Sequence, residues 1–221
     1  MIITIDGPAG AGKSMAARQL AKRMEFRFLD TGAMYRAVTL AGLRQRVDWG
    51  DTGSLAKIAT ELHLELSDDR VLLDGVDVTA EIRSFEVTTL TRYAADNLAV
   101  RERLTELQRA FAKDNDVVTE GRDQATLVFP SAELKIYLTA SDEVRAQRRY
   151  QDLTTRGEQV TLDEVLEKQI QRDKRDLQRE IGGLRKADDS IEVCTDGLLP
   201  DQVVAKLESL ARDRQAALRS T

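Results

Sequence analysis

Gly7-Pro8-Ala9-Gly10-Ala11-Gly12-Lys13-Ser14 follows directly after the apolar run Ile2–Ile5. This stretch fits the pattern G-x-x-x-x-G-K-[ST], which forms a loop around phosphate groups between a strand and a helix. Its glycines allow a tight loop whose backbone N–H groups point inward and bind phosphate oxygens. The stretch therefore predicts a strand, a phosphate-binding loop and a helix that together hold a nucleoside triphosphate.

Each part of this loop has an expected role. The helix after it presents its positive N-terminal end to the phosphates. Lys13 would reach the outer phosphates, and the Ser14 hydroxyl would ligate Mg²⁺. We expect ATP to contact the loop and the residue after it, namely Gly7, Pro8, Ala9, Gly10, Ala11, Gly12, Lys13, Ser14 and Met15.

Composition excludes several classes of protein. The chain has 221 residues, and its net charge of −5 argues against a general nucleic-acid binder, which carries a basic surplus. No apolar run is long enough to span a bilayer. The single cysteine, Cys194, cannot form an internal disulfide, which favours a reducing cytoplasm. We expect small nucleotides as partners, and nothing in the sequence requires more than a monomer.

Strands and helices are predicted to alternate along most of the chain. Strands are expected at Ile2–Ile5, Phe26–Leu29, Val117–Thr119, Leu134–Leu138 and Ser190–Cys194. Helices are expected at Gly12–Met24, Gly32–Arg44, Leu55–Leu62, 79–113, from Asp142, from Thr161 and at Pro200–Arg219. Strands separated by helices predict an α/β fold with a parallel sheet covered on both faces.

One segment has a different pattern. His63–Ser67 alternates with period two, and Arg70–Val78 follows after the turn-forming pair Asp68-Asp69. This pattern predicts a small antiparallel sheet inserted between helices.

Polar residues follow three of the predicted strands, at Asp6-Gly7, Asp30–Gly32 and Glu120–Asp123. Ligands of parallel α/β sheets bind at the carboxyl ends of the strands, so we expect these three segments to meet in one crevice. Glu120, at a strand end, is the acidic group that we expect to help order Mg²⁺.

Arginine is concentrated near these segments. Its planar fork of donors suits phosphate oxygens, although any one of these arginines could instead form a surface ion pair. Spacings of three, four and seven put the last three of them on one helical face. The arginines are Arg36, Arg101, Arg122, Arg145, Arg148, Arg149, Arg172, Arg175 and Arg179.

The motifs, in this order and spacing, resemble those of bacterial cytidylate kinases. They are GPAGAGKS, DTGAMYR (Asp30–Arg36), LDGVDVTAEIR (Leu73–Arg83), VRE (Val100–Glu102), EGRD (Glu120–Asp123), VFP (Val128–Pro130), RDKRDLQR (Arg172–Arg179) and KADD (Lys186–Asp189). The resemblance implies a phosphate-loop kinase with a five-stranded parallel core sheet flanked by helices. It also implies transfer of the γ-phosphoryl group from ATP to CMP or dCMP.

The resemblance implies one kinase domain with three regions. The core would comprise about 1–60, 114–147 and 165–221, with a monophosphate-binding insert at about 61–113. A helical lid would span about 148–164 and bring arginines over the transferring group.

The resemblance also implies roles for individual residues. Arg101 and Asp123 would contact the cytosine, and Asp176 would accept a ribose hydroxyl. The CMP-binding residues would be Thr31, Tyr35, Arg36, Arg101, Arg122, Asp123, Arg172, Asp176 and Arg179. The catalytic residues would be Lys13, Arg122, Arg148 and Arg172.

The chain departs from the family pattern at three places. Gln124-Ala125-Thr126 replaces an apolar residue, glycine and threonine, so Ala125 would be strained if that position needs a positive φ. Arg92 stands where a small hydroxyl residue that contacts the base is common, and Met15 stands where threonine is common.

Two alternative functions remain at this point. Arg92 and Gln124-Ala125 could make the acceptor UMP or another small phosphorylated compound. A nucleotide switch without turnover is the other alternative, but the Asn-Lys-x-Asp motif that reads guanine is absent from the sequence.

Overall fold

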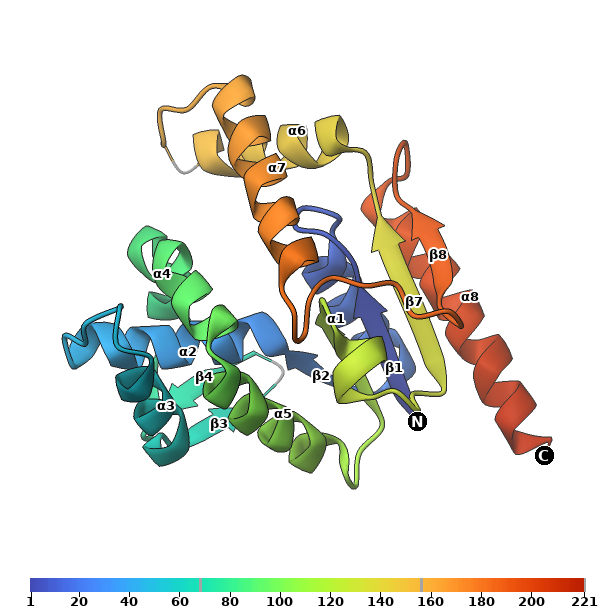
Figure 1. Ribbon diagram of the computed structural model, residues 1–221. Coiled ribbons are helices and arrows are strands. Elements are labelled where there is room, and N and C mark those ends of the chain that lie inside the picture. Colours follow the sequence, from blue (N-terminus) through green and yellow to red (C-terminus); the bar gives the residue numbers. More distant parts are fainter. Residues whose placement is uncertain (68, 156, 221) are drawn as a thin grey trace. The chain divides into compact units, whose positions relative to one another are not determined.

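The computed structural model describes residues 1–67, 69–155 and 157–220 (Figure 1). The chain forms two compact units, the first from Met1–Phe26 and Val118–Thr221 and the second from Arg27–Val117. The predicted boundaries of core, insert and lid stay predictions, and Asp68 of the predicted turn lies outside the described residues.

A five-stranded sheet is the centre of the α/β fold. Its order is β2-β6-β1-β7-β8, with β1 and β7, and β7 and β8, paired in parallel. The strands are β1 (Ile2–Asp6), β2 (Arg27–Asp30), β6 (Val117–Gly121), β7 (Leu134–Thr139) and β8 (Ile191–Cys194). These strands confirm the predicted parallel sheet, because each predicted strand lies within two residues of an observed one.

Helices of the first unit pack in two pairs. Helix α1 (Lys13–Met24) packs against α8 (Pro200–Arg219), and α6 (Asp142–Thr155) packs against α7 (Leu162–Gln178). The second pair has a small core of its own, formed by Ala146, Leu153 and Val165. A single π-helical turn covers Gln124–Val128.

The core of the first unit follows from strand burial. Ile3 and Ile5 of β1 and Ile136 and Leu138 of β7 are completely buried. Leu207 of α8 is also completely buried. Parallel strands that helices cover on both faces show such continuous apolar runs, and this rigid sheet fixes the loops at its strand ends.

The second unit contains α2 (Thr31–Arg44), α3 (Thr52–Glu61) and a three-stranded antiparallel sheet, in the order β3-β4-β5. The strands are β3 (Leu64–Leu66), β4 (Val71–Leu73) and β5 (Val76–Asp77). The pair Asp74-Gly75 joins β4 to β5 with positive φ at both residues, as a two-residue hairpin turn requires. The predicted antiparallel insert is therefore confirmed.

The helical region predicted at 79–113 is interrupted. It consists of a 3-10 turn at Glu81–Arg83, α4 (Phe85–Asp96) and α5 (Leu98–Ala112). Asn97 separates the two helices, because its side-chain oxygen accepts from Val100 N at 3.2 Å and its amide donates to Thr52 O at 2.7 Å. A side-chain cap of this kind starts a new helix.

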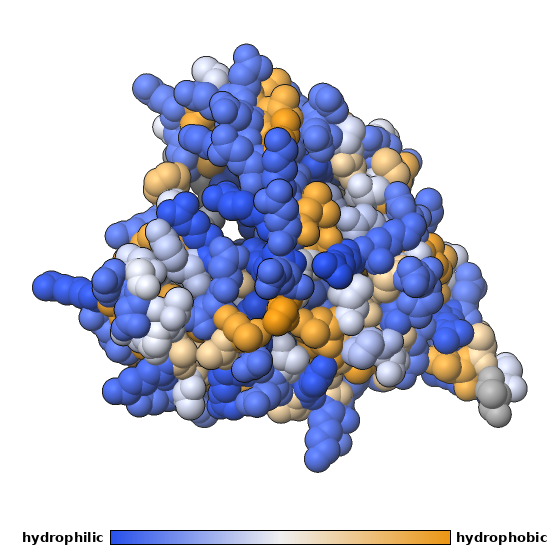
Figure 2. Space-filling view, in the orientation of Figure 1, coloured by the Kyte–Doolittle hydropathy of each residue, from blue (hydrophilic) through white to orange (hydrophobic). Residues whose placement is uncertain are grey.

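The surface is mostly polar. Figure 2 shows a largely hydrophilic face with hydrophobic residues in limited groups between hydrophilic ones. Among the residues that the structure describes, no helix combines the length and the apolar character needed to cross a membrane.

Candidate nucleotide site

The loop between β1 and α1 has the backbone that its glycines predict. Gly7 has a φ of 149°, and a Cβ there would lie 2.0 Å from Leu138 O on the neighbouring strand. Gly12, directly before α1, has a φ of 91°. No other residue type fits at Gly7, because both its φ and the space around it exclude a side chain.

Two side chains at the start of α1 are held in place. Lys13 is buried, and its Nζ donates to Pro8 O at 2.8 Å. Burial, followed by the charge of Arg122, lowers the pKa of Lys13 to about 7. Ser14 Oγ donates to Glu120 Oε1 at 2.8 Å, so the hydroxyl and carboxylate predicted to order Mg²⁺ are neighbours.

Asp6 connects this loop to the end of β6. Its two carboxylate oxygens accept from Gln124 N at 3.0 Å and Ala125 N at 2.7 Å. Burial raises the pKa of Asp6 to about 7 against the opposing effect of these hydrogen bonds. The turn that carries Arg122 and Asp123 is therefore fixed to the base of the phosphate loop.

The departure at Gln124-Ala125 causes no backbone strain. The described non-glycine residues with positive φ are Glu25, Arg46 and Asp74, so Ala125 is not one of them. The side chain of Gln124 is buried and accepts from Thr119 Oγ1 at 2.9 Å. The side chain of Gln124 thus joins the π-helical turn to β6.

A cluster of arginines surrounds Asp176 of α7. Arg122 Nε donates to Asp176 Oδ2 at 3.0 Å, and Arg179 donates to Asp176 Oδ1 at 3.2 Å. Although burial acts in the opposite direction, the charges of Arg122 and Arg172 lower the pKa of Asp176. The pKa of Arg172 is lowered to about 10, first by burial of its charged end and then by the charge of Arg122. The rest of the Arg172 side chain is exposed.

Arg179 differs from the expected helical position. Helix α7 ends at Gln178, and Arg179 has extended backbone dihedrals, so it does not continue the helical face of Arg172 and Arg175. It reaches Asp176 from beyond the end of the helix. Two of the expected phosphate ligands, Arg122 and Arg179, thus share one carboxylate.

The arginines of α6 point to different partners. Arg145 is buried and donates to Ala9 O of the phosphate loop at 2.9 Å. Arg148 donates to Thr195 Oγ1 at 3.0 Å and to Thr195 O at 3.1 Å. Its guanidinium also lies beside the loop, since a Cβ on Gly12 would be 3.9 Å from Arg148 Nη1.

A second group of site residues belongs to the second unit. Asp30 caps the start of α2, where its side chain accepts from Ala33 N at 2.8 Å. Arg36 donates to both oxygens of Asp30 at 3.4 Å, and Arg83 lies 3.6 Å from the same carboxylate. Asp30 thus holds the side chains of Arg36 and Arg83. The next residue, Thr31, is buried and is the first residue of α2.

Arg101 lies close to Tyr35 in the same unit. Its guanidinium lies 5.5 Å from the centre of the Tyr35 ring, and Nη1 donates to Ala95 O at 3.0 Å. Arg92 turns toward Tyr93, whose hydroxyl accepts from it at 3.0 Å. Trp49 lies next to Tyr93, with ring centres 5.5 Å apart.

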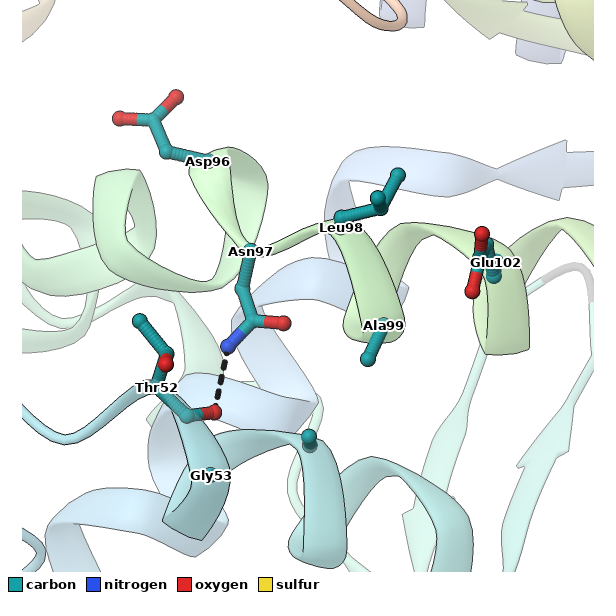
Figure 3. Close-up of a pocket in the computed structure, with 8 residues that line it drawn as sticks. Thr52, Gly53, Asp96, Asn97, Leu98, Ala99 and Glu102 are labelled. Carbon is teal, nitrogen blue, oxygen red and sulfur yellow. Dashed lines mark hydrogen bonds between the residues drawn. The ribbon is translucent and has the colours of Figure 1, made fainter.

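The second unit also has a pocket of about 420 Å³ between the start of α3 and the α4–α5 junction. Figure 3 shows Asn97 at its centre, donating to Thr52 O, while Asp96 points away. Asn97 uses its side chain to cap α5 and to hold α3, so the pocket has a structural explanation.

Most of these site residues were predicted from the sequence, but several of their hydrogen-bond and ion-pair partners were not. The structure brings Asp6-Gly7 and Glu120–Asp123 together within the first unit, while the meeting of Asp30–Gly32 with them stays a prediction. Arg83 and Thr195 were not predicted. Arg83 ends one of the quoted motifs, which was a usable signal, but no pattern in the sequence indicated Thr195.

Comparison with known proteins gives a consistent result. Residues 3–213 match the family model described as cytidylate kinase. The cytidylate kinase of Rhodopirellula baltica is 51% identical over 96% of this chain and 93% of its own length. That of Carboxydothermus hydrogenoformans is 45% identical over 94% of this chain and 95% of its own length.

Solved structures support the fold alone. The shikimate kinase of Bacteroides thetaiotaomicron has a TM-score of 0.51 at 14% identity, covering 96% of this chain and 98% of its own. A protein of Thermus thermophilus gives 0.51 at 17% identity, covering 96% and 97%.

Proposed function

The chain belongs to the cytidylate kinase family and is a nucleoside monophosphate kinase, and we propose that it transfers the γ-phosphoryl group of ATP to CMP or dCMP. The observation that carries this proposal is the pair of hydrogen bonds from Gln124 N and Ala125 N to Asp6. They join the phosphate loop to the turn that carries Arg122 and Asp123. The loop proposed to bind ATP and the turn proposed to contact CMP are thereby held to each other.

ATP would bind through the backbone of Gly7–Ser14 and the following Met15. Lys13 would exchange its bond to Pro8 O for the outer phosphates and follow the phosphoryl group during transfer. Lys13, Arg122, Arg148 and Arg172 would stabilise the negative charge on that group. Arg148 lies beside Gly12, which supports this role.

For CMP, we propose binding residues in each unit separately. Arg36 and Arg101, with Thr31 and Tyr35, would hold its phosphate and base from the second unit. The first unit would contribute Arg122, Asp123, Arg172, Asp176 and Arg179. The acceptor is already a phosphate oxyanion, so the transfer needs no strong general base.

A magnesium ion fits the residues present. Ser14 and Glu120 offer hydroxyl and carboxylate oxygens 2.8 Å apart, and Mg²⁺ prefers oxygen ligands. Mg²⁺ is commonly bound through one or two protein oxygens together with substrate phosphates. When bound, the ion would neutralise phosphate charge.

We also propose a cellular location, an oligomeric state and a class of ligands for the enzyme. The single cysteine cannot form an internal disulfide, which supports a cytoplasmic enzyme. We propose that it acts as a monomer with small nucleotides as its ligands, and not with nucleic acid or membranes.

The activity is tested by measuring ADP release from ATP with a panel of acceptors: CMP, dCMP, UMP, AMP and GMP. We expect the highest kcat/KM with CMP and dCMP. An equal or higher value with UMP, AMP or GMP would contradict the proposed acceptor. The Lys13→Ala variant, prepared identically, shows whether any observed turnover comes from a contaminating kinase.

A further inference from the structure

Arg145 of α6 is an arginine that the proposed chemistry does not use. Its side chain is 4% exposed. Nε donates to Ala140 O at 3.1 Å, and Nη1 donates to Ala9 O at 2.9 Å and to Asp173 Oδ2 at 2.6 Å. Nη2 donates to Asp142. Four of the five N–H groups of the guanidinium are therefore bound to protein, which excludes Arg145 as a phosphate ligand.

Three of the four partners of Arg145 lie outside α6, in separate segments. Ala9 lies in the phosphate loop, Ala140 follows β7, and Asp173 is in the middle of α7. The loop also packs directly on α6, because a Cβ on Gly10 would lie 3.1 Å from Arg145 Cβ. A single guanidinium thus fixes the loop to α7.

Helix α7 carries two further charged residues of the proposed site, Arg172 and Asp176. Asp173 directly follows Arg172, and Asp176 is three residues further on, with its bonds to Arg122 and Arg179. The second oxygen of Asp173, Oδ1, is buried without a hydrogen-bond partner. The bond to Arg145 therefore holds the Asp173 side chain and joins it to the phosphate loop. One turn earlier on α7, Gln169 Nε2 donates to Asp142 O at 3.1 Å, so α7 is also bonded to α6 itself.

We propose that Arg145 is a positioning residue for phosphoryl transfer, which holds the phosphate loop at Ala9 and helix α7 at Asp173 and so sets the distance between Lys13 and the Arg122–Asp176–Arg179 cluster. This proposal rests on the proposed kinase function. An error of about 1 Å in such a distance reduces turnover by about 100-fold.

The test replaces Asp173, because it bonds to Arg145 without being a proposed ligand of either nucleotide. Asp173→Ala removes the acceptor, while Asp173→Asn keeps an acceptor but no charge. We expect kcat per folded molecule to fall by about 100-fold and about 10-fold, respectively. The KM values for ATP and acceptor should change by less than about threefold, because no substrate contact is lost.

The matched control is Glu208→Gln on α8. It removes one charge from an exposed pair in the same unit, where Arg212 donates to Glu208 at 2.7 Å. It should leave kcat unchanged. The folded fraction of each variant is measured by circular dichroism, and if Asp173→Ala does not fold, Asp173→Asn decides the outcome.

The assay uses whichever monophosphate the wild type phosphorylates best. A wild type that prefers another acceptor thus contradicts the CMP assignment without affecting the comparison of variants. Binding of a non-hydrolysable ATP analogue, measured by calorimetry, should be retained in both Asp173 variants. The proposal is overturned if kcat per folded molecule stays within about twofold of wild type, or if the loss appears only in KM.

Discussion

Lys13 is a buried charged side chain that its own loop holds in place. It is buried, and its ammonium group donates to Pro8 O within its own loop. Burial and the nearby charge of Arg122 make the charged form costly, which is why its pKa falls to about 7. A triphosphate in the loop would offset this cost.

We expect Lys13→Ala to reduce kcat by about 100- to 1,000-fold, because it removes a charge aimed at the transferring group. The fold should persist, since the substitution also removes a costly buried charge. Steady-state kinetics and thermal unfolding measure the two effects. A collapse of the Tm, with activity lost only through unfolding, would assign Lys13 a structural role instead.

Asp123 is expected to determine the acceptor and not the donor. It is buried directly before Gln124, whose N–H bonds to Asp6. Asp123→Ala should lower kcat/KM for CMP relative to UMP by about 10-fold or more, the cost of one lost charged hydrogen bond. The KM for ATP should hardly change.

The control for Asp123 is Asp213→Ala, at an exposed position of α8. Both variants are assayed with CMP and UMP at saturating ATP. If the ranking of acceptors is the same in wild type and Asp123→Ala, Asp123 does not contact the base.

Helix α7 begins with a complete capping box. Thr161 Oγ1 accepts from Glu164 N at 3.3 Å, and Thr161 N donates to Glu164 Oε2 at 2.9 Å. Thr161→Ala should lower the free energy of unfolding by about 1 kcal/mol. Urea denaturation checks this value, with Thr88→Ala at an exposed position inside α4 as the control.

An unchanged urea midpoint for Thr161→Ala would show that packing of α7 on α6 alone fixes the start of this helix. Because the cap lies outside the proposed nucleotide contacts, kcat should be retained in either case.

The predictions of helices and loops were confirmed where signals within a few residues determine the structure. The glycine loop, the capping box at Thr161 and the proline at the start of α8 each act within a few residues, and their elements appear as expected. Asn97 was missed as the start of a new helix, although its capping bond to Val100 N is local. Its other bond goes to Thr52 O, which is 45 residues away. No periodicity in the sequence indicates such a contact.

The site shows the same limit. Motifs identified Lys13, Ser14 and Glu120, and these residues lie together. The direction of an arginine on a helix depends instead on what packs against it, so Arg145 and Arg148 could not be distinguished from sequence. Arg145 is buried and donates to Ala9 O, whereas Arg148 donates to Thr195 Oγ1.

The stability of the protein should depend on pH through Asp6. Its pKa is raised by burial from the model-peptide value of 3.8 to about 7, so the folded state holds a proton that the unfolded chain releases. The resulting stabilisation is fully present below about pH 4 and is lost as the pH rises to about 7.

Asp6→Asn removes this titration. Wild type should lose more stability between about pH 5 and pH 8 than the variant, as measured by urea midpoints at both values. The variant should also be less stable at pH 8, because an amide has only one acceptor oxygen for the two N–H groups of Gln124 and Ala125. Parallel pH dependence of the two proteins would show that Asp6 does not titrate in this range.

Trp49 is the only tryptophan in the chain, and it lies in the second unit against Tyr93, which in turn contacts Arg92. The protein therefore carries one tryptophan fluorophore, and it lies against the tyrosine that Arg92 contacts. A monophosphate that displaces Arg92 would change the emission of Trp49, whereas the first unit contributes no tryptophan signal. Acceptor binding can thus be followed optically without a label.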